Sequence, residues 1–357
     1  MTIDLMGKAF DLVHGNLTDL TTAQQNIVIF CRNWLTNAAG FEVKTSGSTG
    51  IPKTIFITRQ QALASVALTQ CALGLQQGWQ SLVCLDTDTI AGKMMLIRSL
   101  EIGMYIHIVK PSNNPFKDLN KSTPIDFLAL VPLQLSQILQ DGNLHELNKT
   151  KVILVGGAPI GASLEKEIQS ITASVYSSYG MTETVSHIAL RLLNTANKQT
   201  NYQKFPAIEI EKDTRNCLCI KGIVTNNQWI KTNDVVELLA DGYFKILGRI
   251  DNVINSGGVK IQLEEIEKII AAAFTEKSIV NRFFLAALPH PTLASQLILV
   301  IEGMEWNTTD QTEILRYLHA QCPKYKAPKY IFFVPQFIET KSQKIDKLAT
   351  KELIGEF

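Results

Sequence analysis

Hydrophobic residues in the first half of the chain follow two arrangements, helical spacing and short continuous runs. Between Thr21 and Asn37, Ile27, Phe30 and Trp34 recur at the spacing of an amphipathic helix. Helices that alternate with apolar strands are typical of a mainly parallel sheet covered on both faces, so we expect an α/β fold. The predicted helices cover residues 21–37, 59–77 and 91–100, and the predicted strands cover 41–44, 54–58, 81–85, 104–109, 125–131, 151–155 and 174–178.

The pattern changes twice in the second half of the chain. From Ala207 to Gly248, consecutive strands separated by turn residues predict an antiparallel segment. After Arg249, a small α+β unit of ordinary domain size follows. We therefore expect a large domain over residues 1–249 and a small domain over residues 252–357. In the small domain the predicted helices cover 262–274 and 310–322, and the predicted strands cover 283–288, 296–301 and 331–334.

Composition restricts the class of protein. The net charge of +1 over 357 residues gives no general field that would attract nucleic acid or an anionic membrane. The six cysteines include no C-x-x-C pair, and Cys217 and Cys219 share one face of a predicted strand, so we expect buried thiols rather than metal ligands. Residues Met1–Phe10 do not resemble a signal peptide, and no apolar run reaches the roughly 18 residues of a membrane helix. We expect a cytoplasmic protein with small-molecule partners and no stable membrane insertion.

A stretch rich in glycine and hydroxyl residues lies between two predicted strands. Glycine lets the backbone approach a ligand closely, and hydroxyls with successive N–H groups can surround phosphate oxygens. It is not a Walker loop, because Pro52 stands where that motif has glycine. A mobile surface loop is the alternative interpretation. The stretch consists of Thr45, Ser46, Gly47, Ser48, Thr49, Gly50, Ile51, Pro52 and Lys53.

Two further segments carry residues suited to a nucleotide. Tyr179 can stack on a planar base, Thr182 can bind phosphate, and the Glu183 carboxylate can hold Mg²⁺. A plain turn with Thr182 as a helix cap is the alternative. Upstream, a strand-end glycine pair offers backbone against which a purine could lie. The segments are Gly156, Gly157, Ala158 and Pro159, and Ser178, Tyr179, Gly180, Met181, Thr182 and Glu183.

A predicted hairpin places a carboxylate beside a guanidinium. Asp241 and Gly242 form a two-residue turn signal between alternating strands. Counting back from that turn puts Asp234 opposite Arg249. The pair can bind ligand hydroxyls and phosphate, or it can be a cross-strand ion pair worth roughly a few tenths of a kcal/mol.

Taken in order, these segments resemble the adenylate-forming superfamily of acyl- and aryl-CoA ligases, luciferases and peptide-synthetase adenylation domains. The resemblance implies a large N-terminal α/β domain with a small C-terminal α+β domain. It also implies ATP and coenzyme A as substrates and Mg²⁺ as the metal ion. The matching segments are 45–53 (phosphate loop), 156–159 (adenine pocket), 179–183 (Y-G-x-T-E), 232–234 (T-G-D, with Asn233 for glycine) and 248–251 (G-R-x-D).

The resemblance also implies roles for single residues. Asp234 would accept both ribose hydroxyls, Arg249 would donate to ribose or phosphate, and Asp251 would be the hinge. Thr182 and Glu183 would take part in catalysis, the latter through the metal.

Two segments of the small domain match the superfamily as well. Gly257, Gly258 and Lys260 resemble the glycine loop that lies along the pantetheine arm of coenzyme A. Lys344 resembles the catalytic lysine, although Gln343 replaces the family's glycine, and a solvated basic tail is the alternative.

Two cationic residues in the segment after residue 85 indicate which kind of acid the protein binds. Lys93 and Arg98 suggest an acid with a second carboxylate, and His187 is a further candidate contact. Alternatively, Arg98 extends along the helix into solvent and Lys93 is solvated. Residues 91–98 and the short N-terminal part, 44 residues before the phosphate loop, resemble the short o-succinylbenzoate–CoA ligases of menaquinone synthesis, whose substrate is an aromatic dicarboxylate.

Other functions stay open from the sequence. The chain could be another aryl- or acyl-CoA ligase or a carrier-protein adenylation enzyme. It could also be a non-catalytic nucleotide-binding relative, because Asn233 and Gln343 depart from the family motifs.

Overall fold

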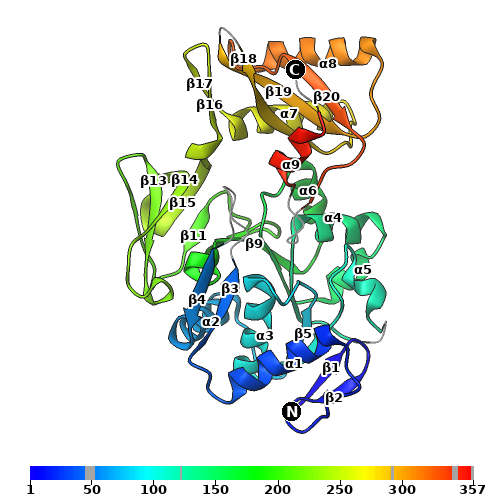
Figure 1. Ribbon diagram of the computed structural model, residues 1–357, viewed down its shortest axis with the longest axis vertical. Helices are drawn as coiled ribbons and strands as arrows, with labels where there is room; N and C mark the ends of the chain where they lie inside the picture. Colours follow the sequence, from blue (N-terminus) through cyan, green and yellow to red (C-terminus); the bar gives the residue numbers. More distant parts are fainter. Residues whose placement is uncertain (45–52, 121–122, 291–292, 340–344, 355–357) are drawn as a thin grey trace.

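The computed structural model describes residues 1–44, 53–120, 123–290, 293–339 and 345–354 (Figure 1). The described part contains a sheet of 13 strands in the order β12-β13-β14-β15-β11-β10-β9-β8-β7-β5-β6-β1-β2. The half of the sheet from β9 to β1 is parallel, which confirms the α/β prediction. The parallel strands are β1 Thr2–Leu5, β5 Gln80–Val83, β6 Tyr105–Ile108, β7 Phe127–Leu130, β8 Val152–Val155 and β9 Ser174–Gly180.

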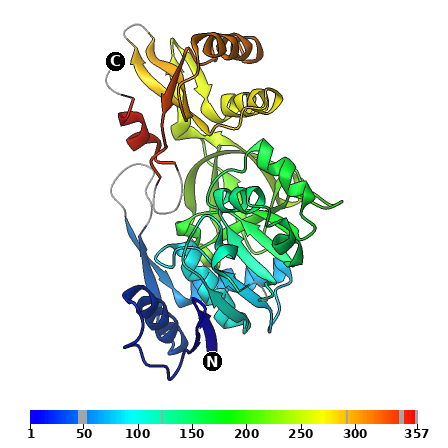
Figure 2. The same cartoon turned by 90° about the vertical axis from the view of Figure 1, so that its right-hand side faces the viewer.

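Helices cover both faces of this parallel half (Figures 1 and 2). Side chains of a strand alternate between the faces, so Leu82 and Val83 of β5 belong to two separate apolar clusters. The cluster around Val83 includes residues of α1 Thr22–Leu35, α2 Arg59–Leu73 and α3 Ile90–Ile102, and that around Leu82 includes residues of α4 Pro132–Gln140, α5 Leu144–Lys149 and α6 Ala162–Glu167.

Local sequence signals set the helix ends. Thr21, Thr58 and Thr89 cap α1, α2 and α3 with their side-chain oxygens. Helix α2 ends at Leu73, four residues before the predicted end, because Gly74 adopts the left-handed conformation at φ +63°.

The other half of the sheet is antiparallel, as predicted for residues 207–248. Cys217 and Cys219 are buried there, which confirms the prediction of buried thiols. Two strands absent from the prediction, β10 and β11, join this half to β9, and β2 Ala9–Asp11 pairs with β1 at the far edge. The antiparallel strands are β10 His187–Leu192, β11 Tyr202–Lys204, β12 Glu209–Lys212, β13 Cys217–Lys221, β14 Ile230–Leu238 and β15 Tyr243–Arg249.

A separate two-stranded sheet flanks the predicted phosphate loop. Its strands are β3 Gly40–Lys44 and β4 Thr54–Thr58, and Lys44 lies opposite Thr54. The prediction that this loop connects two strands is therefore confirmed.

The chain after β15 forms a small α+β part with its own apolar core, in which Ile266 and Ile270 of α7 pack with Leu299 of β19. Gly257 and Gly258, with φ +58° and +82°, make the turn of a hairpin that the sequence analysis did not predict. The elements are β16 Val253–Ser256, β17 Val259–Gln262, α7 Leu263–Glu276, β18 Phe283–His290, β19 Ala294–Glu302, α8 Thr308–Gln321, β20 Tyr330–Val334 and α9 Lys347–Glu352. Short 3₁₀ helices are η1 Pro115–Asp118, η2 Ile168–Ser170, η3 Thr182–Thr184, η4 Ile223–Thr225, η5 Ala240–Gly242 and η6 Ile250–Asn252.

Candidate active site

The candidate nucleotide residues gather at the carboxyl ends of β8 and β9, the edge where open α/β sheets bind ligands. Gly156 and Gly157 follow β8 directly, and a Cβ on Gly156 would collide with Ser178 Oγ of β9. Gly157 has φ +88°, which favours glycine. The residues from Gly157 to Pro159 are exposed, so their backbone is open to a ligand.

Tyr179 connects this edge to the antiparallel half of the sheet. Its ring is buried against Tyr202 and Phe244, with ring centroids 5.9 and 5.4 Å away. Its hydroxyl donates to Asp234 Oδ2 at 2.5 Å, and burial together with the Asp234 charge raises the pKa of Tyr179 above its ordinary value. Tyr179 therefore fixes one oxygen of Asp234, the carboxylate that is predicted to bind the ribose.

Asp234 lies opposite Arg249, as the hairpin count predicts, and Arg249 Nη1 donates to Asp234 Oδ1 at 3.1 Å. The predicted two-residue turn is wrong, because the turn is the three-residue segment Ala240–Gly242. The extra residue shifts the pairs nearest the turn by one position. A β-bulge between Val235 and Val236 then restores the predicted register.

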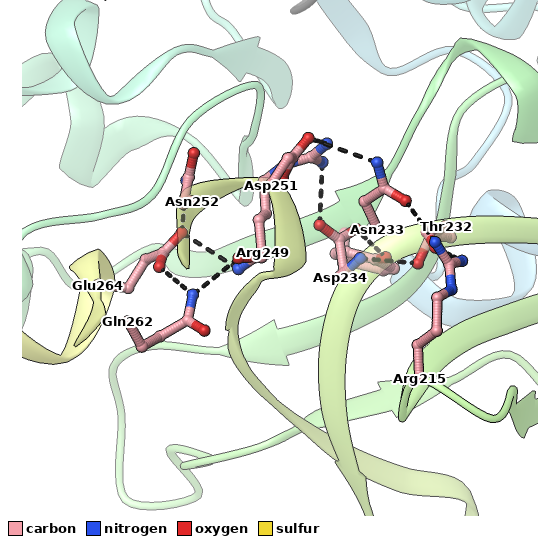
Figure 3. A network of polar contacts seen from close by, with 10 residues as sticks. Arg215, Thr232, Asn233, Asp234, Arg249, Asp251, Asn252, Gln262 and Glu264 are labelled. Carbon is pink, nitrogen blue, oxygen red and sulfur yellow. Dashed lines mark hydrogen bonds and ion pairs between the residues drawn. The ribbon is translucent and has the colours of Figure 1, made fainter. Parts of the chain in front are cut away.

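The Arg249 guanidinium also binds Asp251, with Nε–Oδ1 at 2.9 Å and Nη2–Oδ2 at 2.7 Å (Figure 3). The hydrogen bonds that Arg249 donates to Asp251 raise the pKa of Arg249. Burial would raise the pKa of Asp251, but its bonds with Arg249 lower it overall. Asn233, which stands where the family has glycine, accepts from Arg215 Nη1 at 3.2 Å and donates to Asp251 at 3.4 Å. Arg249 is thus shared between the predicted ribose site and the predicted hinge.

The segment after β9 presents the predicted metal residue. Thr182 and Glu183 lie in η3, and the Glu183 side chain is exposed. The next residue but one, Val185, is buried with φ +66°, an uncommon conformation for a β-branched residue. This sharp turn leaves Glu183 at the surface of the nucleotide edge and directs the chain back into the sheet as β10.

Arg98 is the centre of a second, buried polar cluster. Its side chain is 2% exposed, so the alternative that it extends into solvent is wrong. Arg98 Nη2 lies 3.5 Å from Thr69 Oγ1 and 3.4 Å from Ser186 Oγ, beyond the usual range for a strong hydrogen bond. Arg98 Nε and Ser65 Oγ are buried without a hydrogen-bond partner among the described residues. The cluster therefore has unused capacity to bind a polar group.

His187 completes this cluster and stays neutral. Its Nε2 is 3.1 Å from Thr69 Oγ1 and its Nδ1 is 3.1 Å from Ser186 Oγ. Burial and the nearby Arg98 charge lower the pKa of His187 well below its ordinary value. Burial also lowers the pKa of Arg98 to about 10, which leaves it charged at neutral pH. The cluster therefore carries one buried positive charge.

Lys93 lies elsewhere on α3. Its Nζ donates to the Thr87 carbonyl at 3.0 Å and lies 4.7 Å from the centre of the Phe30 ring. It is half-buried, and burial lowers its pKa. Lys93 and Arg98, both predicted to contact the second carboxylate, thus lie beside different residues.

The remaining predicted residues are placed as follows. Lys53, directly before β4, and Lys260, in β17, are exposed. Within the described ranges, no three His, Cys, Asp or Glu side chains are arranged to hold a metal ion. None of the helices described here has both the length and the apolar character needed to cross a membrane. Thr45, Ser46, Gly47, Ser48, Thr49, Gly50 and Lys344 lie outside the described residues.

Several polar side chains of these clusters were not predicted from the sequence. Ser65 and Thr69 occupy positions in the buried stripe of α2, between Ala62 and Leu73. Polar residues in an apolar helical stripe are a signal that could have identified them. Ser186 carries no comparable signal, because its position depends on the turn at Val185.

The fold and the site define a class of protein. A doubly covered parallel sheet, an adjoining hairpin with an Asp–Arg pair at the ligand edge, and a small α+β part form the fold of adenylate-forming enzymes. Residues 44–211 match the family described as AMP-binding enzyme.

Solved structures agree with this class. An acyl-CoA synthetase (AMP-forming)/AMP-acid ligase II-like protein from Dyadobacter fermentans is 40% identical, with 94% of this chain and 95% of that chain covered and a TM-score of 0.63. The o-succinylbenzoate coenzyme A synthetase from Bacillus subtilis, solved in complex with ATP and magnesium ion, shares the fold at 22% identity, with 87% and 69% covered and a TM-score of 0.71. The chain belongs to the AMP-binding enzyme family.

Curated relatives carry a more particular name. A 2-succinylbenzoate–CoA ligase from Haemophilus influenzae is 29% identical over 342 residues, which cover 87% of this chain and 71% of the relative. The enzyme of the same name from Staphylococcus aureus is 26% identical over 325 residues, which cover 85% and 65%. The chain thus spans about two thirds of the length of these relatives.

Proposed function

We propose that the protein is an AMP-forming acid–CoA ligase that converts 2-succinylbenzoate, ATP and coenzyme A into 2-succinylbenzoyl-CoA, AMP and diphosphate. Its proposed setting is menaquinone biosynthesis in the cytoplasm. The names of the curated relatives support the ligase class. The choice of a dicarboxylic acid is carried by Arg98, a fully buried cation whose Nε has no partner in the described part of the chain. A second carboxylate would supply the missing counter-charge.

In the proposed first step, the acid carboxylate attacks the α-phosphate of ATP and diphosphate leaves. Asp234, oriented by the Tyr179 hydroxyl, would bind the ribose, and Arg249 would donate to ribose or phosphate. Glu183 is an exposed carboxylate at the correct edge, and one carboxylate plus phosphate oxygens suits Mg²⁺, which would neutralise phosphate charge when bound. We assign Lys344 the stabilisation of charge on the leaving diphosphate.

In the proposed second step, the coenzyme A thiolate attacks the acyl-adenylate and AMP leaves. We propose that residues 1–249 and 252–357 are two domains and that the small one turns about Asp251 between the steps, a gating motion. The turn would bring Gly257, Gly258 and Lys260 to the pantetheine arm.

The test is diphosphate release with matched aromatic acids, one with a remote second carboxylate and one without. Arg98→Met should raise the KM of the diacid by roughly 10- to 100-fold, because a charged hydrogen-bonded contact is worth about 1.5–3 kcal/mol. The monoacid should be little affected.

Lys93→Met is the matched control, because it removes a cation from the same helix. Its contacts with Thr87 and Phe30 predict small and equal effects on both acids. Equal losses for both acids in Arg98→Met would show that Arg98 is structural and would refute the diacid assignment.

A further inference from the structure

Side chains at the start of α7 bind the main chain of Arg249 (Figure 3). Glu264 Oε1 accepts from the Arg249 N–H at 3.2 Å and from Asn252 Nδ2 at 2.6 Å. Gln262 Nε2 donates to the Arg249 carbonyl at 2.8 Å and to Glu264 Oε2 at 2.5 Å. Glu264 and Gln262 thus occupy both backbone polar groups of Arg249, and Asn252 holds Glu264. These three residues are called the Arg249 anchor below.

The anchor is built into a half-buried position. Gly248, the residue before Arg249, is buried, and any side chain there would collide with the ends of Gln262 and Glu264. Glu264 lies in the first turn of α7, where the helix dipole favours a carboxylate. A carboxylate that accepts from three donors is also firmly oriented.

The anchor connects the predicted ribose site to the small part of the molecule. Arg249 ends β15 of the large sheet, whereas Gln262 and Glu264 lie beyond the linking segment Ile250–Asn252. The Arg249 side chain meanwhile reaches Asp234. Rotation of α7 about the linking segment would break the bonds from Gln262 and Glu264, so the anchor belongs to one orientation of the small part.

The arrangement of elements indicates which orientation this is. Helix α9, which begins three residues after Lys344, lies on the side of the small part that faces the large sheet (Figures 1 and 2). The β16–β17 hairpin, whose turn holds Gly257 and Gly258, extends away from the large sheet (Figure 1). In terms of the proposed function, this is the arrangement for forming the adenylate.

We propose that Gln262 and Glu264 are positioning residues for the first half-reaction. They hold Arg249 in place for the nucleotide and stabilise the adenylate-forming orientation of the small part. This inference rests on the proposed ligase function, and its test includes a measurement that does not depend on activity.

The kinetic test separates the two half-reactions. Glu264→Ala should slow acid-dependent diphosphate release at least tenfold and raise the KM for ATP. Thioester formation from pre-made acyl-adenylate should stay within about twofold. Glu264→Gln, which keeps an acceptor for the Arg249 N–H, should recover part of the loss. Equal slowing of both half-reactions would overturn the inference.

Glu265→Ala is the matched control. Its carboxylate is adjacent in the chain but pairs with Lys326, so that the contact stays within the small part. Both half-reactions should remain near normal in this variant. A loss equal to that of Glu264→Ala would overturn the assignment to the anchor.

The orientation itself can be measured by pulsed electron spin resonance. One spin label goes on Cys71, which is exposed on α2, and the other on a Met304→Cys variant, where Met304 is 90% exposed in the small part. The other five cysteines are buried. We expect a narrow distance distribution that broadens in Glu264→Ala and not in Glu265→Ala. An unchanged distribution would refute the inference, whereas a broadened one in a chain that releases no diphosphate would support the anchor and refute only the ligase function.

Discussion

Removing one oxygen atom from Tyr179 tests how the candidate nucleotide site is organised. The Tyr179→Phe variant keeps the ring, which packs against Tyr202 and Phe244, and removes the hydroxyl that donates to Asp234. The change therefore leaves no large cavity, and its effect reports on the hydrogen bond.

The size of the effect follows from the contact. A hydrogen bond to a charged partner contributes about 1.5–3 kcal/mol. In the variant, Asp234 keeps its bond to Arg249 at 3.1 Å, so the carboxylate stays paired, but its other oxygen is no longer held by a hydrogen bond. We expect the KM for ATP to rise roughly tenfold, which corresponds to about 1.4 kcal/mol. The KM for the acid should be nearly unchanged, because the Arg98 cluster contains no atom of Tyr179 or Asp234.

The assay measures diphosphate release as a function of ATP concentration. It compares wild type, Tyr179→Phe, Asp234→Ala and the double variant in a double-mutant cycle. Asp234→Ala alone should weaken ATP binding by more than Tyr179→Phe and leave acid binding largely intact. In the Asp234→Ala background, Tyr179→Phe should have almost no further effect, because the acceptor is already missing. An equal effect of Tyr179→Phe in both backgrounds would refute the reasoning, and the hydroxyl would then act on another group.

The other predictions concern the catalytic cycle and pH. Lys344→Ala should abolish adenylate formation while pre-made acyl-adenylate and coenzyme A still react at a near-normal rate; equal slowing of both half-reactions would make the lysine structural. Asp251→Pro should slow thioester formation more than adenylate formation, because proline restricts rotation at the proposed hinge while Arg249 keeps its bond to Asp234. His187 has a lowered pKa in the folded state, so below about pH 6.5 the unfolded chain protonates this imidazole while the folded chain does not. The free energy of unfolding therefore falls with falling pH, by up to about 1.4 kcal/mol per pH unit. Between pH 7.5 and pH 5.5, the free energy of unfolding should fall more for wild type than for His187→Gln. Equal decreases in the two proteins would contradict a lowered His187 pKa.

Local patterns in the sequence determined most elements of this protein. Apolar periodicity and caps such as Thr21 and Thr58 act within a few residues of themselves, so helices α1 and α2 were predictable. The turn at Asp241 and Gly242 identified the hairpin, and Asp234 was correctly placed opposite Arg249. That pairing depended on two errors that cancel, because neither the three-residue turn nor the bulge at Val235 has a distinct sequence signal.

Tertiary structure alone decided which polar groups meet. The Tyr179 hydroxyl reaches Asp234 across 55 residues because β9 and β14 lie in one sheet. Arg98 of α3 reaches Ser186, at the turn before β10, across 88 residues. Arg98 had two sequence interpretations, solvent or pocket, and its burial excludes the first. The Arg249 anchor was also unpredictable, because an acidic helix start such as Glu264 is favoured by the helix dipole alone. The sequence determines which groups are available for chemistry, whereas the packing of distant segments determines which of them are oriented, buried and left with a charge that a ligand can neutralise.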